Sequence, residues 1–376
     1  MPGIGAKVVF DAGELDHLIA VLRQQGMLVL GPKVEDAAVI YAPLDSAADL
    51  PTGWTDRCEA GTYRLSRAAD NSPASFGYTL GVQGWKRALY PPRQKLFHAE
   101  RAGSGFRVLR EHDPAQPMAF LGVRGCELAA IRVQDAVFDS HGFAEPGYLG
   151  RRRQSLIIAV ECSHAAETCF CASAGAGPAV GTGVDIVLNE IVEDGAARYV
   201  AEARSERGLA VLAHLTVRPA TTDEIDTARH QPQQAARQQT RGLDPDAAGV
   251  LARNLENPRW AQVAQRCLTC ANCTMVCPTC YCTTVEDVTD LSGNHAERWR
   301  RWDSCFTIDY SYIHGGSVRN ETASRYRQWI THKLSTWHSQ FGASGCVGCG
   351  RCIAWCPVGI DITEEVRVLR ETEQGR

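Results

Sequence analysis

The sequence predicts an α+β protein, with an α/β domain in its N-terminal part and a smaller, helical, cysteine-rich domain in its C-terminal part. Two observations lead to this prediction. Between residue 1 and about residue 220, short β-branched runs alternate with segments of helical periodicity. Eleven of the 16 cysteines then lie between Cys267 and Cys356, and the other five are spread over the rest of the chain. The C-terminal window is therefore expected to be a separate functional unit.

The composition is that of an ordinary globular protein. The chain has 376 residues, enough for two or three domains, with 44% hydrophobic and 22% charged residues. A formal net charge of −4 provides no attraction to nucleic acid. No secretory signal is visible and no apolar run approaches the roughly 18 residues that span a bilayer, so we expect a cytoplasmic protein. Because cytosolic thiols stay reduced, so many cysteines indicate metal or redox chemistry.

The N-terminal part reads as alternating strands and helices. Residues 6–10 and 28–30 are expected to be short strands, with an amphipathic helix over 15–25 between them. Residues 119–123 form another apolar run, and residues 128–138 after it have helical spacing. This alternation favours an α/β domain.

Two of the predicted strands end close to a cysteine. Cys126 follows the strand at 119–123, and Cys162 follows a strand predicted over 155–160. Ligands of open α/β sheets collect beyond the carboxyl ends of strands, so both thiols are well placed for a site. Residues 184–192 and 198–203 are expected to form a β-hairpin.

A change of composition marks the domain boundary. Residues 221–249 are rich in Gln, Ala and Asp and contain potential breakers at 231–234 and 242–245. We therefore expect an α/β domain over 1–220, a linker over 221–249 and a helical domain over 250–376. A helix over 247–266 should lead directly into Cys267.

Two cysteine runs carry the strongest functional signal. Cys267-x2-Cys270-x2-Cys273-x3-Cys277-Pro278 has the spacing of a bacterial ferredoxin ligand run, and Cys346-x2-Cys349-x2-Cys352-x3-Cys356-Pro357 repeats it. In proteins with two [4Fe-4S] clusters, the fourth cysteine of each run binds the other cluster. We therefore assign one cluster to Cys267, Cys270, Cys273 and Cys356, and the second to Cys346, Cys349, Cys352 and Cys277.

A zinc site also uses paired cysteines, but zinc ribbons do not use a C-x2-C-x2-C-x3-C-P run. The two runs are separated by 68 residues, which predicts a ferredoxin-like domain carrying an insertion. The insertion contains Cys280, Cys282 and Cys305. These thiols either contribute to a further centre or are reduced, buried cysteines beside a cluster, and the sequence does not separate these alternatives.

Four N-terminal thiols form a further candidate site. Cys126, Cys162, Cys169 and Cys171 could hold a third [4Fe-4S] cluster, or they are structural or sensing cysteines. The glycine-rich segment at 175–181 lacks the spacing of a dinucleotide fingerprint and follows no strand, so it is interpreted as a loop over the Cys169 and Cys171 site.

The sequence contains no Ser-His-Asp arrangement, H-E-x-x-H motif or P-loop, so no residue is assigned a catalytic role and none is assigned to an organic cofactor. Several clusters without substrate chemistry indicate an electron conduit, in which the protein spaces and tunes its cofactors. A sensor of oxygen or iron is a weaker alternative, because no DNA-binding motif accompanies the cysteines.

Six segments together resemble a known family, and the match runs in order from about residue 90 to 360. The chain is similar to the iron–sulfur β subunit of cytoplasmic NAD(P)-linked [NiFe]-hydrogenases of the sulfhydrogenase type, a wider family that includes the electron-transfer subunit of anaerobic sulfite reductase. The segments are Pro91-Pro92-Arg93-Gln94-Lys95-Leu96, Gly122-Val123-Arg124-Gly125-Cys126-Glu127, Thr168-Cys169-Phe170-Cys171, Cys277-Pro278-Thr279-Cys280-Tyr281-Cys282, Arg301-Trp302-Asp303-Ser304-Cys305 and Cys346-Val347-Gly348-Cys349-Gly350-Arg351-Cys352.

The resemblance implies a subunit that relays electrons between a flavin subunit, which oxidises or reduces NAD(P)H, and the hydrogenase small subunit, which leads to the Ni-Fe site in the large subunit. Such a subunit has no active site of its own. The alternative partner is the sirohaem protein of an anaerobic sulfite reductase. The direction of electron flow and the choice between NAD and NADP stay open.

Overall fold

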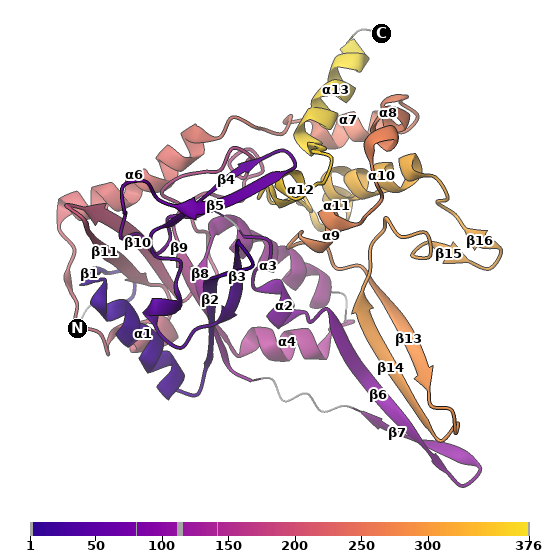
Figure 1. Cartoon of the computed structure of the whole chain (residues 1–376), viewed down its shortest axis with the longest axis horizontal. Helices are drawn as coiled ribbons and strands as arrows, with labels where there is room; N and C mark the ends of the chain where they lie inside the picture. The colour runs from indigo at the N-terminus through magenta and orange to yellow at the C-terminus, as the bar shows by residue number, and fades with distance from the viewer. Residues whose placement is uncertain (1–2, 80, 111–115, 141, 375–376) are drawn as a thin grey trace.

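The computed structural model describes residues 3–79, 81–110, 116–140 and 142–374. It confirms a mixture of helices and sheets. The N-terminal part is built on a large twisted sheet, and the cysteine-rich C-terminal part packs against one edge of it (Figure 1).

The large sheet has eight strands in the order β12-β1-β11-β10-β9-β8-β2-β3. The neighbours β2, β8, β9 and β10 run parallel, and the remaining pairs are antiparallel. Every residue of β8 and β9 is buried, as expected for central strands covered on both faces. The strands are β1 (Lys7–Asp11), β2 (Leu28–Glu35), β3 (Ala38–Pro43), β8 (Met118–Val123), β9 (Ser155–Val160), β10 (Ile186–Glu193), β11 (Ala196–Ala203) and β12 (Arg218–Pro219).

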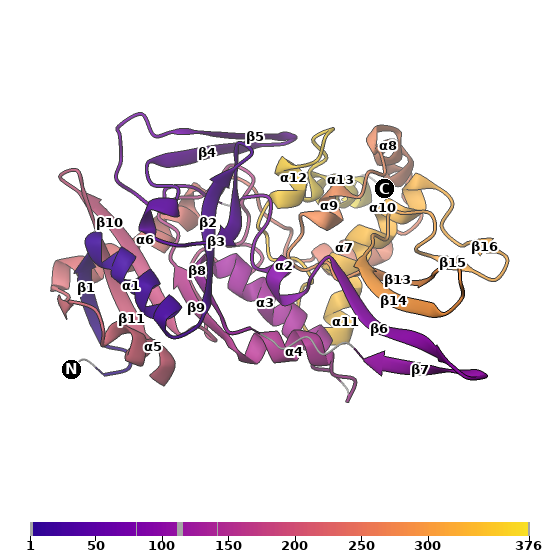
Figure 2. The same ribbon diagram turned by 60° about the horizontal axis from the view of Figure 1, so that its bottom comes forward.

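Helices cover both faces of this sheet and create two cores (Figure 2). On one face, α1 (Gly13–Gln24), α5 (Glu206–Leu212) and the short η1 (Ala47–Asp49) pack over residues such as Leu121 and Ile158. The other face carries α2 (Lys86–Leu89), α3 (Gly125–Phe138) and α4 (Pro146–Arg153). The strands and helices expected for residues 6–30 and 119–160, and the hairpin of β10 and β11, are confirmed within a few residues at each end.

The expected linker contains a long helix. α6 (Thr222–Gln238) begins with a capping box in which the Thr221 hydroxyl accepts from the Glu224 N–H at 3.3 Å. It packs on the sheet, where Asn189 Nδ2 donates to the Ala228 carbonyl at 2.9 Å. Reading Pro232 as a breaker was wrong, because burial of one helix face against the sheet outweighs the one hydrogen bond that proline removes. The domain boundaries themselves stay a prediction.

The C-terminal part is mainly helical, with a core of aromatic and aliphatic side chains. The single helix expected over 247–266 is instead two helices, because Asn254 and Asn257 form a turn and Pro258 begins the second helix. Its helices are α7 (Ala247–Arg253), α8 (Arg259–Arg266), α9 (Asn272–Met275), α10 (Thr322–Thr331), the π-helical turn η2 (His332–Thr336), α11 (Trp337–Phe341), α12 (Arg351–Ala354) and α13 (Ile362–Gln374).

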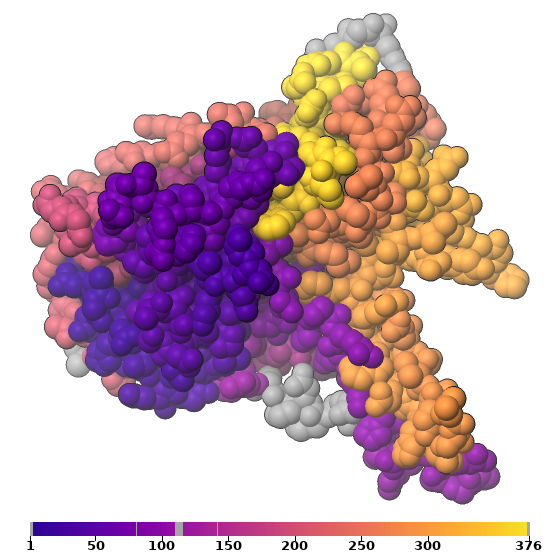
Figure 3. Space-filling model, viewed as in Figure 1, coloured from indigo at the N-terminus to yellow at the C-terminus, as the bar shows by residue number. Residues whose placement is uncertain are grey.

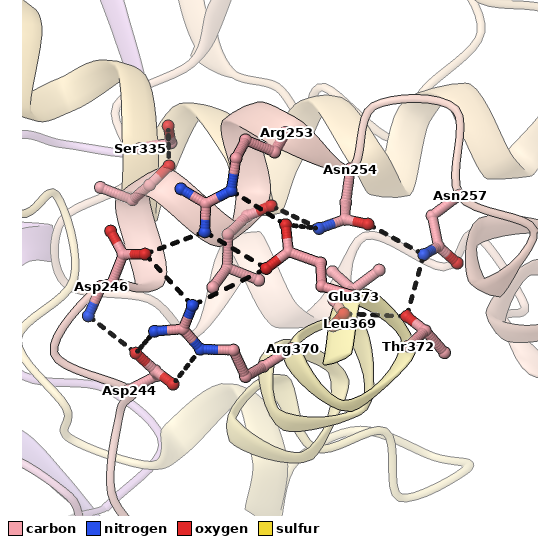
Figure 4. Close-up of polar contacts among 12 residues, drawn as sticks. Asp244, Asp246, Arg253, Asn254, Asn257, Ser335, Leu369, Arg370, Thr372 and Glu373 are labelled. Carbon is pink, nitrogen blue, oxygen red and sulfur yellow. Dashed lines mark hydrogen bonds and ion pairs between the residues drawn. The ribbon is translucent and has the colours of Figure 1, made fainter. Parts of the chain in front are cut away.

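A polar network ties the last helix to the first helix of this part (Figure 4). Arg253 of α7 pairs with Glu373 of α13 at 3.0 Å, and Arg370 pairs with Asp244 at 3.1 Å. On the other side of α7, the Ser335 hydroxyl of η2 donates to the Ala248 carbonyl at 2.8 Å. The three elements α7, η2 and α13 are therefore joined into one scaffold.

The insertion between the cysteine runs forms half of a projecting arm. Strands β13 (Thr283–Thr289) and β14 (His295–Trp302) pair with β6 (Arg93–Ala102) and β7 (Gly105–Arg110) in the order β13-β14-β6-β7. In the space-filling view this four-stranded arm extends from the body of the molecule (Figure 3). The insertion also contains the small hairpin of β15 (Tyr312–Ile313) and β16 (Gly316–Ser317).

Another β-hairpin links the N-terminal part of the chain to the C-terminal part. The strands β4 (Trp54–Glu59) and β5 (Thr62–Arg67) reach from the N-terminal part to α12 (Figure 2). At the tip the Gly61 N–H donates to the Ile353 carbonyl at 3.0 Å, and Tyr63 stacks on Trp355 with ring centroids 5.0 Å apart. The segment that leads to Cys356 is therefore held against this hairpin.

Candidate metal centres

Four thiols assigned from the sequence to one cluster line a single cavity. Its other walls are almost entirely apolar and include the rings of Phe306, Tyr326 and Trp329 and the side chain of Ile360. The four thiols are those assigned from the sequence to the first cluster, here called the first thiol set: Cys267, Cys270, Cys273 and Cys356. Cys352, assigned to the second cluster, also lines this cavity, so the two sets adjoin.

The local backbone explains how one short run presents three thiols. α8 ends at Arg266, and Cys267 follows in extended conformation. Thr269 and Ala271 then take left-handed backbone angles, with φ of 50° and 64°, which turn the chain tightly before α9. From the other run, the Ile360 N–H donates to Cys356 Sγ at 3.3 Å. Burial raises the pKa of the Cys267 and Cys273 thiols, so they need a cation to hold them as thiolates.

The second thiol set consists of Cys277, Cys346, Cys349 and Cys352. Cys346, Cys349 and Cys352 all interact electrostatically with Cys277, so these four thiols lie near one another. Cys273 also interacts with Cys277, so the crossed grouping stays a prediction. Burial raises the pKa of Cys346 to about 12. The Gly348 N–H donates to Cys346 Sγ at 3.5 Å, the kind of contact that fixes a ligand in its loop.

A buried lysine touches the second set and was not foreseen from the sequence. Lys333 Nζ donates to Cys277 Sγ at 3.3 Å, to Thr279 Oγ1 at 2.6 Å and to the Gly345 carbonyl at 3.1 Å. A hydrogen bond from Cys280 and then the positive charge of Lys333 lower the pKa of the Cys277 thiol. A lone lysine in a helical stretch carries no sequence signal for this role.

A second buried lysine lies nearby. Lys86 Nζ donates to the Cys277 carbonyl at 3.2 Å and lies 3.9 Å from the centroid of the Trp302 ring. Burying two ammonium groups is costly unless negative charge is close. The surroundings of Cys277 therefore suit an anionic group, as a cluster with four thiolate ligands is.

The four N-terminal thiols also lie together. Cys126 is in the first turn of α3 and Cys162 follows β9, at the carboxyl ends of neighbouring parallel strands, as expected. Burial raises the pKa of Cys126, and the charges of Cys171 and Cys162 add to this effect. Cys169 interacts with Cys171 and Cys162 in the same way. This N-terminal set adjoins the second set, because Cys126, Cys169 and Cys171 also interact with Cys349.

Backbone packing joins the N-terminal set to the second cysteine run. The Phe170 N–H donates to the Gly348 carbonyl at 2.9 Å. Gly348 has a φ of 63°, and a Cβ there would lie 2.6 Å from the Cys171 Cα. A Cβ on Gly350 would overlap the Thr168 carbonyl. These glycines therefore allow the Thr168-Cys169-Phe170-Cys171 segment to lie directly on the loop of the second run.

A buried ion pair reinforces this junction. Arg351, directly after Gly350, donates to Glu127 at 2.7 Å, and the side chains are 3% and 1% exposed. Glu127 follows Cys126, so the pair connects residues adjacent to both sets. The glycine-rich segment packs over the N-terminal set as expected, with Gly177 close enough that a Cβ would lie 3.2 Å from Cys171 Sγ.

The three cysteines of the insertion occupy two positions. Cys280 interacts with Cys277, whereas Cys282 lies beside Cys305. The backbone holds the second pair together, because the Asp303 N–H donates to the Cys282 carbonyl at 2.8 Å. A hydrogen bond from Cys305 lowers the pKa of the Cys282 thiol.

No three His, Cys, Asp or Glu side chains among the described residues are arranged to hold a single metal ion. In those same ranges, no helix is both long and apolar enough to cross a membrane.

The comparison with protein families agrees with the thiol geometry. Residues 266–360 match the family described as a 4Fe-4S dicluster domain, which covers both cysteine runs and the insertion. The C-terminal part is thus a dicluster iron–sulfur domain, and the match supports two [4Fe-4S] clusters.

A curated relative extends the match to most of the chain. Sulfhydrogenase 2 subunit beta of Pyrococcus furiosus is 30% identical over 318 residues, which cover 84% of this chain and 90% of the relative. The chain belongs to the family of sulfhydrogenase β subunits. The resemblance stated from the six segments is confirmed.

Proposed function

We propose that this chain is the electron-transfer iron–sulfur subunit of a cytoplasmic hydrogenase complex. It relays electrons between a flavin subunit that binds NAD(P)H and the small and large subunits of a [NiFe]-hydrogenase. The observation that carries the proposal is the convergence of thiols from both cysteine runs on one cavity, directly beside a second thiol set.

The three thiol sets form a series. The first set adjoins the second through Cys352, and the second adjoins the N-terminal set through Cys349. When bound, [4Fe-4S] clusters accept and donate single electrons. Three adjacent sets therefore suit a chain that conducts electrons through the protein, with the second set in the middle.

We also propose that the N-terminal set binds a third [4Fe-4S] cluster. Its four thiols are buried or half-buried, and they come from the ends of two strands and one loop. The loop at 175–181 covers them and the ion pair of Arg351 and Glu127 anchors them to the second run. No residue of the chain is assigned a catalytic role, since the thiol sets account for the proposed activity.

Iron and acid-labile sulfide per chain, measured on anaerobically purified protein, test the number of clusters. About twelve irons support three clusters, and about eight support the two of the dicluster domain alone, at four irons per cubane. Cys169→Ser should remove about four irons while both dicluster signals remain in electron paramagnetic resonance spectra. An unchanged iron content in this variant contradicts the third cluster.

Purification of the native complex tests the partners. We expect a flavoprotein and the nickel-containing large subunit to co-purify with the chain, detected by absorbance and metal analysis. A sirohaem protein in place of the nickel protein would instead assign the chain to an anaerobic sulfite reductase.

A further inference from the structure

We propose that the buried ammonium group of Lys333 raises the reduction potential of the cluster on the second thiol set, and so makes the middle position of the relay easier to reduce than the first. This inference rests on the proposed function only in that the first and second thiol sets each bind a cluster. Nothing in the cysteine spacing distinguishes the two positions in this way.

The hydrogen bonds of Lys333 fit a charged side chain. Nζ has three acceptors, namely Cys277 Sγ, Thr279 Oγ1 and the Gly345 carbonyl. The Thr279 hydroxyl donates to the Gly345 carbonyl at 2.8 Å, so its oxygen accepts from Nζ. A neutral amine has only two hydrogens, whereas an ammonium has three. A cysteine that binds a cluster is deprotonated, so Cys277 Sγ can then only accept, and the three contacts together require the ammonium form.

The charge is buried without a carboxylate partner. Lys333 is 6% exposed, and among the described residues no Asp or Glu forms an ion pair with it. Its anionic neighbour is the sulfur of Cys277, a ligand in the second set. In a medium of low polarity, a unit charge at this distance interacts strongly with the group that the sulfur helps to hold.

The fold holds Lys333 in this place from several sides. It lies in the π-helical turn η2, a distortion that is frequent at functional sites. The Gly345 N–H donates to the Lys333 carbonyl at 2.8 Å, and Lys333 Nζ donates to the Gly345 carbonyl, so two hydrogen bonds join these residues. Ser335 in the same turn is bonded to Ala248 of α7, within the scaffold of Figure 4. The lysine is therefore positioned by structure that also fixes the residue before Cys346.

No cation lines the cavity of the first thiol set. Arg325 is also buried near this set: burial raises the pKa of the Cys267 thiol, and the charge of the Arg325 guanidinium opposes that effect. Arg325 Nη1 donates to the carbonyls of Arg319 and Asn320, and among the described residues no hydrogen bond joins it to a sulfur of the set. The cavity walls apart from the thiols are Leu268, Ala271, Phe306, Tyr326, Trp329, Pro357, Val358 and Ile360. Reduction adds one negative charge to a cluster, which an apolar surrounding disfavours and a nearby cation favours. Of the two environments, that of the second set therefore favours the reduced state more.

The test is a redox titration of the full-length, anaerobically purified protein, followed by electron paramagnetic resonance, for the wild type and for Lys333→Met. We expect the potential of the second cluster to become more negative by at least a tenfold change in its one-electron equilibrium, about 59 mV. The first cluster should keep its potential and serves as an internal reference. The signals are assigned with Cys277→Ser and Cys356→Ser variants.

Three further variants separate charge from packing. Lys333→Gln retains hydrogen-bond donors without charge and should shift the potential as Lys333→Met does. If the methionine variant does not bind iron, the glutamine variant tests the effect of the charge in its place. Lys333→Arg retains the charge and should restore most of the wild-type potential. Lys86→Met removes an equally buried lysine that contacts a carbonyl instead of sulfur, so its shift should be smaller than that of Lys333→Met.

Three results overturn the inference while the proposed function stands. One is a second cluster that is present and unshifted in both uncharged variants. Another is an equal shift of both clusters in the Lys333 variants. The third is a shift in Lys86→Met as large as that in Lys333→Met. Wild-type protein that binds no cluster at the second set contradicts the proposed function itself, and iron analysis detects this separately.

Discussion

The two ferredoxin-type runs have the same cysteine spacing, but their thiol sets lie in different surroundings. The first set lines a cavity with aromatic and aliphatic walls. The second is enclosed by the N-terminal part of the chain, with a buried lysine on Cys277 and a buried ion pair beside Cys349. A cysteine motif thus determines which atoms can bind a cluster, whereas the surrounding fold determines the charge and polarity that the cluster experiences.

The difference follows from what packs on each loop. The first run is covered by the helices α8 and α10 of its own domain, which offer apolar side chains. The second run is covered by the Thr168-Cys169-Phe170-Cys171 segment, whose backbone lies against Gly348 and Gly350. The second set therefore lies under the Cys169 and Cys171 segment of the N-terminal part, whereas the first set meets that part beside Cys356, at the tip of the β4–β5 hairpin.

The largest effect is expected from replacing the cysteine that each set takes from the other run. Cys356→Ser should remove the cluster of the first set, and Cys277→Ser should remove that of the second, each with a loss of about four irons. Iron analysis and electron paramagnetic resonance measure both. If Cys277→Ser removed the signal that depends on Cys267, Cys270 and Cys273, the crossed grouping would be wrong.

A smaller effect is expected from adding a methyl group where the Thr168 carbonyl packs on the loop of the second set. Gly350→Ala places a Cβ against the Thr168 carbonyl at a φ of 72° and should destabilise the protein by about 2–5 kcal/mol. Gly342→Ala is the matched control, because its φ is 71° and a Cβ there meets nothing within 4 Å. It should cost only about 1–2 kcal/mol. Thermal unfolding measures the difference, and equal losses would show that the close packing at Gly350 is unimportant.

A substitution in the apolar wall of the first thiol set should destabilise the protein less. Ile360→Val removes one methylene from a 5% exposed side chain and should cost about 0.5–1.5 kcal/mol. The unfolding midpoint in denaturant measures this loss. The spectrum of the second cluster should stay unchanged, and a change confined to that cluster would contradict the separation of the two environments.

The smallest effect is expected from a substitution far from both thiol sets, which serves as a control. Thr221→Ala removes the cap of α6 and should cost about 1 kcal/mol. Iron content and both cluster potentials should match the wild type. A shifted potential in this variant would mean that general loss of stability, and not local charge, accounts for shifts seen in the Lys333 variants.

Much of the N-terminal fold could be predicted because its signals are local. The strand before Cys126 and the strand before Cys162 are continuous apolar runs, and the structure confirms both. The prediction failed where tertiary contacts outweigh local preference. Pro232 lies inside α6 because that helix is buried against β10, and the helix expected over 247–266 divides at Pro258.

The sequence by itself predicted which cysteines bind the two clusters of the dicluster domain, since a tight C-x2-C-x2-C turn brings three thiols together through backbone geometry alone. Only the tertiary structure decided what surrounds them. The position of Lys333 against Cys277, the pairing of β14 with β6 and the packing of Cys171 on Gly348 join residues far apart in the chain. Such contacts depend on the packing of whole elements, which no local spacing encodes.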